Sequence, residues 1–294
     1  MQRLDRFLAP LVPEASRLIE EGRVFIDGVR ARSGRLALEA GAVVTLSRAR
    51  AATGAVELLG RRGGFVAVAK PAGIPTEPDH RGGAGSVRHQ AAVALGVRER
   101  ELHAATRLDA PVSGVVLLVL GASARRELER WRAEGRLVRR YLALAVAAPR
   151  PAAGCWDRPI GQRFAPGSAE RGALTRYSTV ATATRGVAPG LPGVALLALA
   201  PATGRGHQLR IHAAGGGAPM LGDLEHGGPG QCVLDDGSVL SFDRVGLHAA
   251  RLTVLLPGAP AWEITAETPA SLRTWWAQLG GDDEAWSKGL TVDP

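Results

Sequence analysis

One aspartate stands where a polar turn meets an apolar strand. Residues 106–114 read TRLDAPVSG and continue as VVLLVL, so Asp109 follows Arg107 by two residues and precedes an apolar run of strand length. A carboxylate at the edge of so dry a sheet needs a nearby cation, because otherwise its pKa rises until it is neutral. Arg107 and the basic segments RRY and GRGHQLR offer such cations. A charge-paired carboxylate of this kind fits catalysis, and it equally fits a structural ion pair.

The composition excludes several classes of protein. Of the 294 residues 46% are hydrophobic and 22% are charged, which is typical of a globular chain. No uncharged run is long enough to cross a bilayer, and the N-terminal MQRLDRFLAP lacks the apolar centre of a signal peptide, so we expect a cytoplasmic protein. The two cysteines, Cys155 and Cys232, are too few for a disulfide framework or a zinc knuckle.

The charge balance points towards a polyanionic partner. The chain has 36 Lys and Arg and a net charge of +8, and each phosphate that a cation neutralises releases counterions. Abundant Ala, Gly and Arg can also follow from a GC-rich genome, so charge alone is weak ground. The histidines include His207 and His212, but their spacing does not place two ligands on one helical face. We therefore expect structural histidines and no metal site.

A small unit precedes the main part of the chain. Residues 1–50 contain a helix around RLDRFLA, a second helix in SRLIEEG that stops at Gly22, and a strand, turn and strand in RVFIDGVRA. Residues 51–63 are expected to form a linker. Basic residues in the unit fit either a solvated face or a surface that binds nucleic acid. They are Arg3, Arg6, Arg17, Arg23, Arg30, Arg32 and Arg35.

The elements of the main part are mixed in type. The patterns predict strands in FVAVAK, which would present Lys70 at its end, and in SGVVLLVL, RLVRRYLALAVA and GVALLALAP. They predict helices in 87–95, in ARRELERWRAEG, in HQLRIHAA and after Pro269, and a late hairpin in LHAARLTVLLP and AWEITAETP. Because strands and helices do not alternate regularly, we expect an α+β fold with a mixed sheet.

Four separated stretches together resemble the pseudouridine synthases of the RluA type. They are AKPAGIPTEP at 69–78, TRLDAPVSG at 106–114, RRYLAL at 139–144 and GRGHQLRIHAAGGGAPMLGD at 204–223. The resemblance covers about residues 64–280 in the family's order, which leaves 281–294 as a C-terminal tail. It implies a mixed, largely antiparallel central sheet with flanking helices. It also implies an isomerase that converts uridine in RNA to pseudouridine and needs no cofactor.

The resemblance assigns roles to three residues. Asp109 falls on the family's catalytic aspartate, Tyr141 on the ring that stacks on the uracil, and Arg210 on the partner that pairs with the aspartate. An Asp can act as nucleophile or as base at the ribose, and both remain open. Without the resemblance, Tyr141 would be ordinary core packing, and Arg210 a solvated residue or a partner of a helix dipole.

The substrate implied by the resemblance is structured RNA whose target uridine is flipped out of its helix. Arg107, Arg205, Lys70 and His207 are candidates to bind it. We expect ribosomal RNA as substrate, with transfer RNA as the main alternative, and a monomeric enzyme. A rival interpretation is a catalytically inactive RNA-binding or ribosome-assembly protein that retains the fold. A third, a glycosidase-type acid, would need a second carboxylate, and none is evident near Asp109 in the sequence.

The chain departs from the family at several positions. Thr106 stands where the family has His, Val112 where it has Thr, Ala218 where it has His, and His226 where it has Tyr. These changes bear on fine positioning, and so on rate or target choice. The first fifty residues resemble the alpha-L RNA-binding domain, in RLDRFLA, SRLIEEGRVFIDG and EAGAVVTL, with several residues fewer between the first two.

Overall fold

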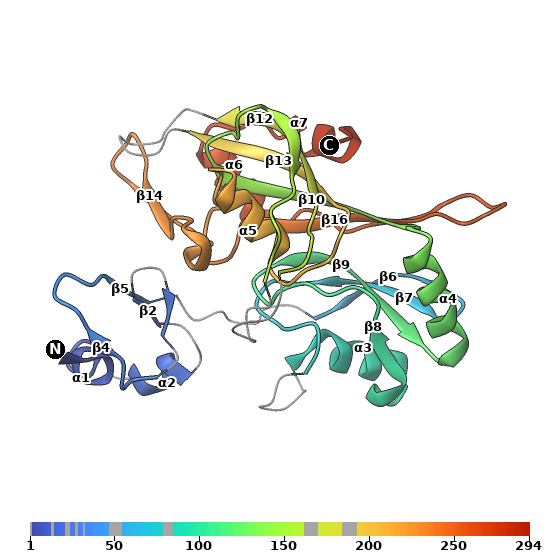
Figure 1. Ribbon diagram of the computed structural model, residues 1–294, viewed down its shortest axis with the longest axis horizontal. Helices are drawn as coiled ribbons and strands as arrows, with labels where there is room; N and C mark the ends of the chain where they lie inside the picture. Colours follow the sequence, from blue (N-terminus) through green and yellow to red (C-terminus); the bar gives the residue numbers. More distant parts are fainter. Residues whose placement is uncertain are drawn as a thin grey trace.

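The computed structural model in Figure 1 describes most of the chain. The described residues are 2–12, 15–20, 24–26, 29–31, 33–46, 55–78, 85–161, 170–183 and 193–294. Their main feature is a ten-stranded sheet with the order β11-β12-β13-β10-β16-β9-β7-β6, to which β17 adds beside β16 and β8 beside β9. The strands are β6 (Glu57–Arg62), β7 (Phe65–Lys70), β8 (Leu102–Ala104), β9 (Ser113–Leu120), β10 (Leu137–Val146), β11 (Ala153–Trp156), β12 (Thr175–Ala183), β13 (Val194–Pro201), β16 (Leu247–Val254) and β17 (Trp262–Thr265).

The sheet is mixed but largely antiparallel, as predicted. Of the pairs between these strands only β9 with β16 is parallel, with Ser113 opposite His248 and Gly114 opposite Ala249. Gly114 has φ +122°, and a Cβ added there would lie 2.2 Å from the Ala249 carbonyl oxygen. This close approach explains the glycine that ends TRLDAPVSG, since no other residue accepts both the dihedral and the contact.

Helices cover both faces of the sheet (Figure 1). They are α3 (Val87–Leu95), η2 (Glu99–Glu101), α4 (Ala122–Ala133), α5 (Gln208–Gly215), η3 (Leu224–His226), α6 (Ala270–Gln278) and α7 (Glu284–Thr291), and a hairpin of β14 (Gln231–Val233) and β15 (Val239–Ser241) follows η3. On β9, Val116 and Leu118 pack on the side of α3 and α5, and Leu117 packs on the side of α4. The continuous apolar run SGVVLLVL is therefore a strand buried on both faces, as predicted.

The side chains of β10 also alternate between the two faces of the sheet. Tyr141 and Ala143 lie on the side of α5, whereas Leu142 and Leu144 lie against α6 and α7. Because side chains of a strand point alternately to its two faces, the Tyr141 ring lies on the face of the sheet that α5 covers.

Two predicted boundaries were wrong. Residues 51–63 are not only a linker, because β6 forms at Glu57–Arg62 and pairs antiparallel with β7. Residues 281–294 are not a loose tail, because α7 inserts Trp286, 2% exposed, into the core around Leu142. Burying so large an apolar ring is favourable enough to fix a short terminal helix.

The N-terminal unit has its own small core. It contains β1 (Gln2–Arg3), α1 (Leu4–Leu8), α2 (Ala15–Glu20), β2 (Val24–Ile26), β3 (Val29–Arg30), β4 (Ala37–Leu38) and β5 (Val44–Leu46), drawn in blue in Figure 1. Leu4, Leu8, Ile19 and Val24 pack together. The predicted helices and the paired strands are present, while Gly22, Arg23 and Arg32 lie outside the described residues. RNA binding by this unit remains a prediction. In the described parts of the chain no helix is long and apolar enough to cross a membrane.

Candidate active site

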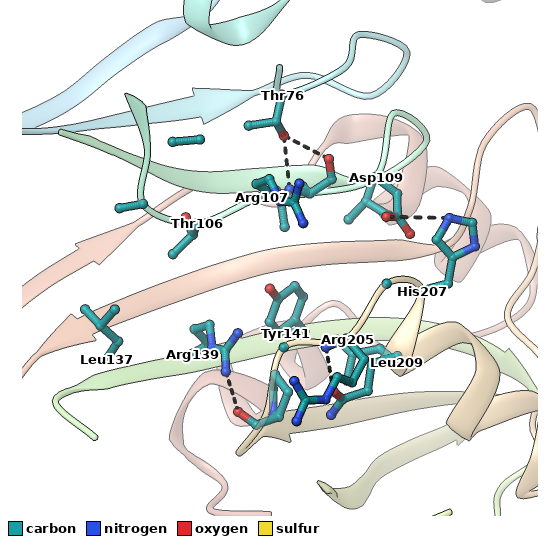
Figure 2. Close-up of a pocket in the computed structure, with 18 of the residues that line it drawn as sticks. Thr76, Thr106, Arg107, Asp109, Leu137, Arg139, Tyr141, Arg205, His207 and Leu209 are labelled. Carbon is teal, nitrogen blue, oxygen red and sulfur yellow. Dashed lines mark hydrogen bonds and ion pairs between the residues drawn. The ribbon is translucent and has the colours of Figure 1, made fainter. Parts of the chain in front are cut away.

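A cavity of about 760 Å³ opens between β10 and two loops of the main sheet. One loop, residues 104–112, leads into β9, and the other, residues 201–207, connects β13 to α5. Six of the seven candidate residues line it, namely Arg107, Asp109, Tyr141, Arg205, His207 and Arg210. Figure 2 labels all of these except Arg210. The fold thus brings together residues that lie about a hundred positions apart in the chain.

The turn that carries Asp109 is held by hydrogen bonds from other segments. The Thr76 hydroxyl donates to the Leu108 carbonyl over 2.8 Å and accepts from the Leu108 amide over 3.0 Å, as Figure 2 shows. The Val112 amide closes the turn on the Asp109 carbonyl at 3.0 Å. Thr106, which replaces the family's His, accepts a hydrogen bond from the Leu117 amide. Asp109 is therefore presented by a fixed backbone and not by a mobile loop.

Lys70 lies elsewhere, and its predicted role in binding RNA was wrong. Its side chain is 1% exposed, and its ammonium donates to the carbonyl oxygens of Pro71, Ala110 and Val112 at 2.9, 3.1 and 2.6 Å. A buried ammonium cannot reach a phosphate. The strand pattern located Lys70 at the end of β7 but could not tell that the Asp109 turn folds over it, where the ammonium donates to backbone carbonyls.

Arg210 joins three carboxylates beneath the cavity. Its Nε and Nη2 donate to Asp223 at 2.8 and 2.6 Å, Nη2 also donates to Glu225 at 2.9 Å, and Nη1 donates to Asp109 at 3.1 Å. The Arg210 side chain is 3% exposed, and that of Asp109 is 27% exposed. Burial by itself lowers the pKa of Arg210, but Asp223 and then Asp109 outweigh it, so the pKa is raised. A permanent cation therefore faces one oxygen of Asp109 while that carboxylate stays open to the cavity.

Two further acids that the sequence analysis did not select contact Arg210. Asp223 and Glu225 are 1% and 9% exposed, and the expectation that no second carboxylate lies near Asp109 was wrong. Both are held by Arg210, and neither lines the cavity. The only available signal was the Gly-Asp pair that ends the segment 204–223.

Tyr141 forms part of the cavity wall on β10 (Figure 2). The side chain is 8% exposed and also belongs to the core on the side of α5, so core packing and cavity lining coincide. Burial raises the pKa of its hydroxyl, Arg139 lowers it and Asp109 raises it further, and the net shift is upward. The phenol is thus neutral at neutral pH, and its contribution to the site is a flat, uncharged ring.

Two arginines lie at the rim of the cavity. Arg107 is exposed, and Arg205, half-buried, donates from Nε to the Gly172 carbonyl at 3.1 Å. The neighbouring Arg139 donates from Nη2 to the carbonyls of Pro201 and Thr203, which fixes the start of the second loop against β10. Cations at the rim of a cavity that holds a carboxylate suit a substrate with phosphates around a neutral reacting group.

His207 stands between Asp109 and a pair of residues from η3. It has φ +55°, its Nε2 lies 3.8 Å from Asp109 Oδ1, and its Nδ1 lies 3.1 Å from Arg210 Nη1 and from His226 Nε2. His226, which replaces the family's Tyr, thus contacts the site through His207. His212 lies apart from this contact, because its ring nitrogens bond to Thr175 Oγ1 and to the Arg158 carbonyl, as expected of a structural histidine.

Comparisons with known proteins agree with this geometry. The model of the RNA pseudouridylate synthase family matches residues 64–215. An uncharacterized RNA pseudouridine synthase of Mycobacterium bovis is 31% identical over 92% of this chain and 92% of its own length, and one of Chloroflexus aurantiacus is 30% identical over 95% and 90%. The dual-specificity RNA pseudouridine synthase RluA of Escherichia coli is 31% identical over 56% of this chain and 71% of its own.

A solved structure supports the fold alone. Human RNA pseudouridylate synthase domain containing 4 has 22% sequence identity and a TM-score of 0.57, over 76% of this chain and 93% of the human one. The family model spans more than half of the chain, and it includes the turn of Asp109, the ring of Tyr141 and the helix of Arg210. With these matches and this fold, the chain belongs to the RNA pseudouridylate synthase family and is an RNA pseudouridine synthase.

Proposed function

We propose that this enzyme isomerises specific uridines of ribosomal RNA, with Asp109 as its catalytic residue. One observation supports the catalytic role of Asp109: its carboxylate is held by a buried guanidinium and still faces a cavity walled by a tyrosine ring. A cavity of about 760 Å³ has ample room for a single nucleotide, so the uridine would enter flipped out of its helix.

The proposed reaction breaks one bond of the uridine and forms another. The bond between C1′ and N1 breaks, the uracil turns while it remains bound, and C1′ joins C5, after which the C5 proton is lost and N1 carries a proton. Asp109 assists at the ribose, either by attacking C1′ or by taking a proton there, and is regenerated at the end. The Tyr141 ring supports the loose base, because a flat surface permits a rotation that directional hydrogen bonds would prevent.

The electrostatics of the site favour this division of work. Arg210 gives Asp109 a charge partner that stays in place after the substrate has displaced water from the cavity, where an unpaired charge would be costly. Arg107 and Arg205 at the rim would contact the phosphates on either side of the flipped nucleotide. Binding to a large structured RNA is supported by the resemblance of residues 1–50 to an RNA-binding domain and by the net charge of +8.

A modification assay tests the proposal. The purified chain is incubated with unmodified ribosomal RNA and with unmodified transfer RNA, and pseudouridines are mapped in both. We expect new sites in ribosomal RNA with the wild type and with Asp157→Asn, a change of the same charge at an exposed aspartate outside the cavity. We expect none with Asp109→Asn.

The outcomes separate the parts of the proposal. Sites in transfer RNA alone would contradict the choice of substrate. Undiminished modification by Asp109→Asn would contradict the catalytic role. A wild type that binds ribosomal RNA as tightly as Asp109→Ala and modifies no uridine in either RNA would indicate the inactive RNA-binding protein.

A further inference from the structure

Three side chains next to Asp109 have the chemistry of a metal site. His207 precedes α5, and Glu225 and His226 belong to η3. Each offers one nitrogen or oxygen ligand, and these atoms lie within 4.8 Å of one another. All three residues are partly exposed, so an ion from solvent can reach them without opening the core.

The separations fit a small tetrahedral ion. His207 Nδ1 lies 3.1 Å from His226 Nε2 and 3.5 Å from Glu225 Oε2. With bonds of about 2.0–2.1 Å, a tetrahedral Zn²⁺ holds neighbouring ligand atoms about 3.4 Å apart. Two imidazoles and one carboxylate also form a donor set that suits Zn²⁺ better than Ca²⁺ or Mg²⁺.

The surrounding charges favour a cation. Hydrogen bonds join the Arg210 guanidinium to the carboxylates of Asp109, Asp223 and Glu225, which leaves two negative charges in excess within this group. An excess of negative charge in a partly buried site is costly, and a divalent ion at Glu225 would offset it.

We propose that His207, Glu225 and His226 form an inhibitory site for a divalent ion of the Zn²⁺ type. The ion would take His207 Nδ1 and Glu225 Oε2, which now lie 3.1 and 2.9 Å from Arg210. It would also fix the His207 proton on Nε2, which lies 3.8 Å from Asp109 Oδ1, in the arrangement of a carboxylate, a histidine and a metal. Both effects draw electron density from Asp109, which weakens it as a nucleophile or base, so a bound ion slows the reaction.

The binding part of the test needs no RNA. Metal-free protein is titrated with Co²⁺, whose visible absorption reports four-coordinate binding, and with Zn²⁺ by calorimetry. We expect one ion per chain, no absorption band from a thiolate, and affinity at least about tenfold weaker in His226→Gln and in His226→Tyr, whose tyrosine is the family's residue. The control is His89→Gln, which removes a surface histidine 3.0 Å from Glu99.

The second part rests on the proposed function. Each variant's rate of pseudouridine formation with Zn²⁺ is divided by its own rate without metal. We expect this ratio to fall about tenfold in the wild type and in His89→Gln, and to stay near one in both His226 variants. Wild-type affinity in the His226 variants, a thiolate band, or binding that leaves the rate unchanged would overturn the proposal. A protein that binds Co²⁺ through His226 but makes no pseudouridine would refute the proposed function and leave the metal site standing.

Discussion

Two polar clusters flank the start of β9, and TRLDAPVSG supplies a residue to each. The active-site cluster consists of Asp109, Arg210, Asp223, Glu225 and His207. The core cluster consists of Lys70, Ser113, Arg244 and His248. Both contain buried cations, since Arg210 is 3% exposed and Lys70 is 1% exposed. The clusters differ in the groups to which these cations donate hydrogen bonds.

In the core cluster, Lys70 and Arg244 donate to backbone carbonyls, and Arg244 also donates to the Ser113 hydroxyl. Arg244 Nη2 donates to Ser113 Oγ at 2.7 Å and to the Leu247 carbonyl at 2.9 Å, and Ser113 Oγ lies 2.8 Å from His248 Nδ1. These contacts tie β9 to β16 where the two strands run parallel. In the active-site cluster the cation holds an acid that remains accessible. The comparison teaches that a buried cation can serve two ends, because it can stabilise the backbone or hold a carboxylate that faces a cavity.

The largest expected effect comes from removing each cluster's arginine. Arg210→Met should lower the rate of pseudouridine formation by roughly a hundredfold or more, because Asp109 loses its cation. It should also cost about 3–5 kcal/mol of the free energy of unfolding, since Asp223 stays buried without its partner. Arg244→Met should reduce stability and spare the rate per folded molecule. Rates are measured on RNA and stabilities by urea.

A conservative change guards against misfolding in that comparison. Arg210→Lys keeps the charge but loses the two parallel hydrogen bonds to Asp223, and we expect the rate to fall more than about tenfold. Loss of activity per folded molecule in Arg244→Met with none in Arg210→Lys would reverse the roles of the clusters.

Acid should act on the core cluster through His248. Burial chiefly lowers the pKa of His248 from 6.5 to about 4, so the folded protein binds this proton less readily than the unfolded chain. The stabilisation is complete above pH 6.5 and is lost as the pH falls towards 4, by about 3 kcal/mol. We expect the unfolding free energies of the wild type and His248→Asn to converge by this amount over that range. Parallel curves for the two proteins would refute the assignment.

Lys70 and Arg107 should separate stability from binding. Lys70→Met removes three hydrogen bonds from the ammonium to backbone carbonyls, so it should cost at least about 2 kcal/mol and leave KM for RNA unchanged. Arg107→Ala should leave the unfolding free energy unchanged, raise KM and reduce the salt slope of binding by about one. If Lys70→Met changed the salt slope, the buried ammonium would have to reach RNA after all.

The smallest expected effect is that of Tyr141→Phe. The ring and not the neutral hydroxyl is proposed to support the base, so the rate should stay within about threefold of the wild type. Tyr141→Leu keeps an apolar side chain and removes the flat face, and it should cost about 1–3 kcal/mol of transition-state stabilisation. Equal losses in both variants, measured as kcat/KM, would assign the hydroxyl a role.

Local pattern sufficed for much of the fold. The apolar run of β9 predicted a strand buried on both faces, and the motif order led to the α+β fold and to Asp109, Tyr141 and Arg210, which share one cavity. The local pattern failed where a segment has too little hydrophobic periodicity to be assigned to a helix or strand. Residues 57–62 and 284–291 gain their structure from β7 and from a buried Trp286, and neither contact is visible locally.

The sequence by itself determined the long apolar strands, such as β7, β9, β10 and β13, and the motifs that the chain carries, because these depend on neighbours along the chain. Only the tertiary structure decided which polar groups meet. Asp109 and Arg210 are 101 residues apart, and Glu225 follows Arg210 by 15. Lys70 turned inward because the Asp109 turn offered it two carbonyls, those of Ala110 and Val112. Hydrogen bonds and ion pairs depend on distances of a few ångströms between loops, and no periodicity in a sequence encodes them.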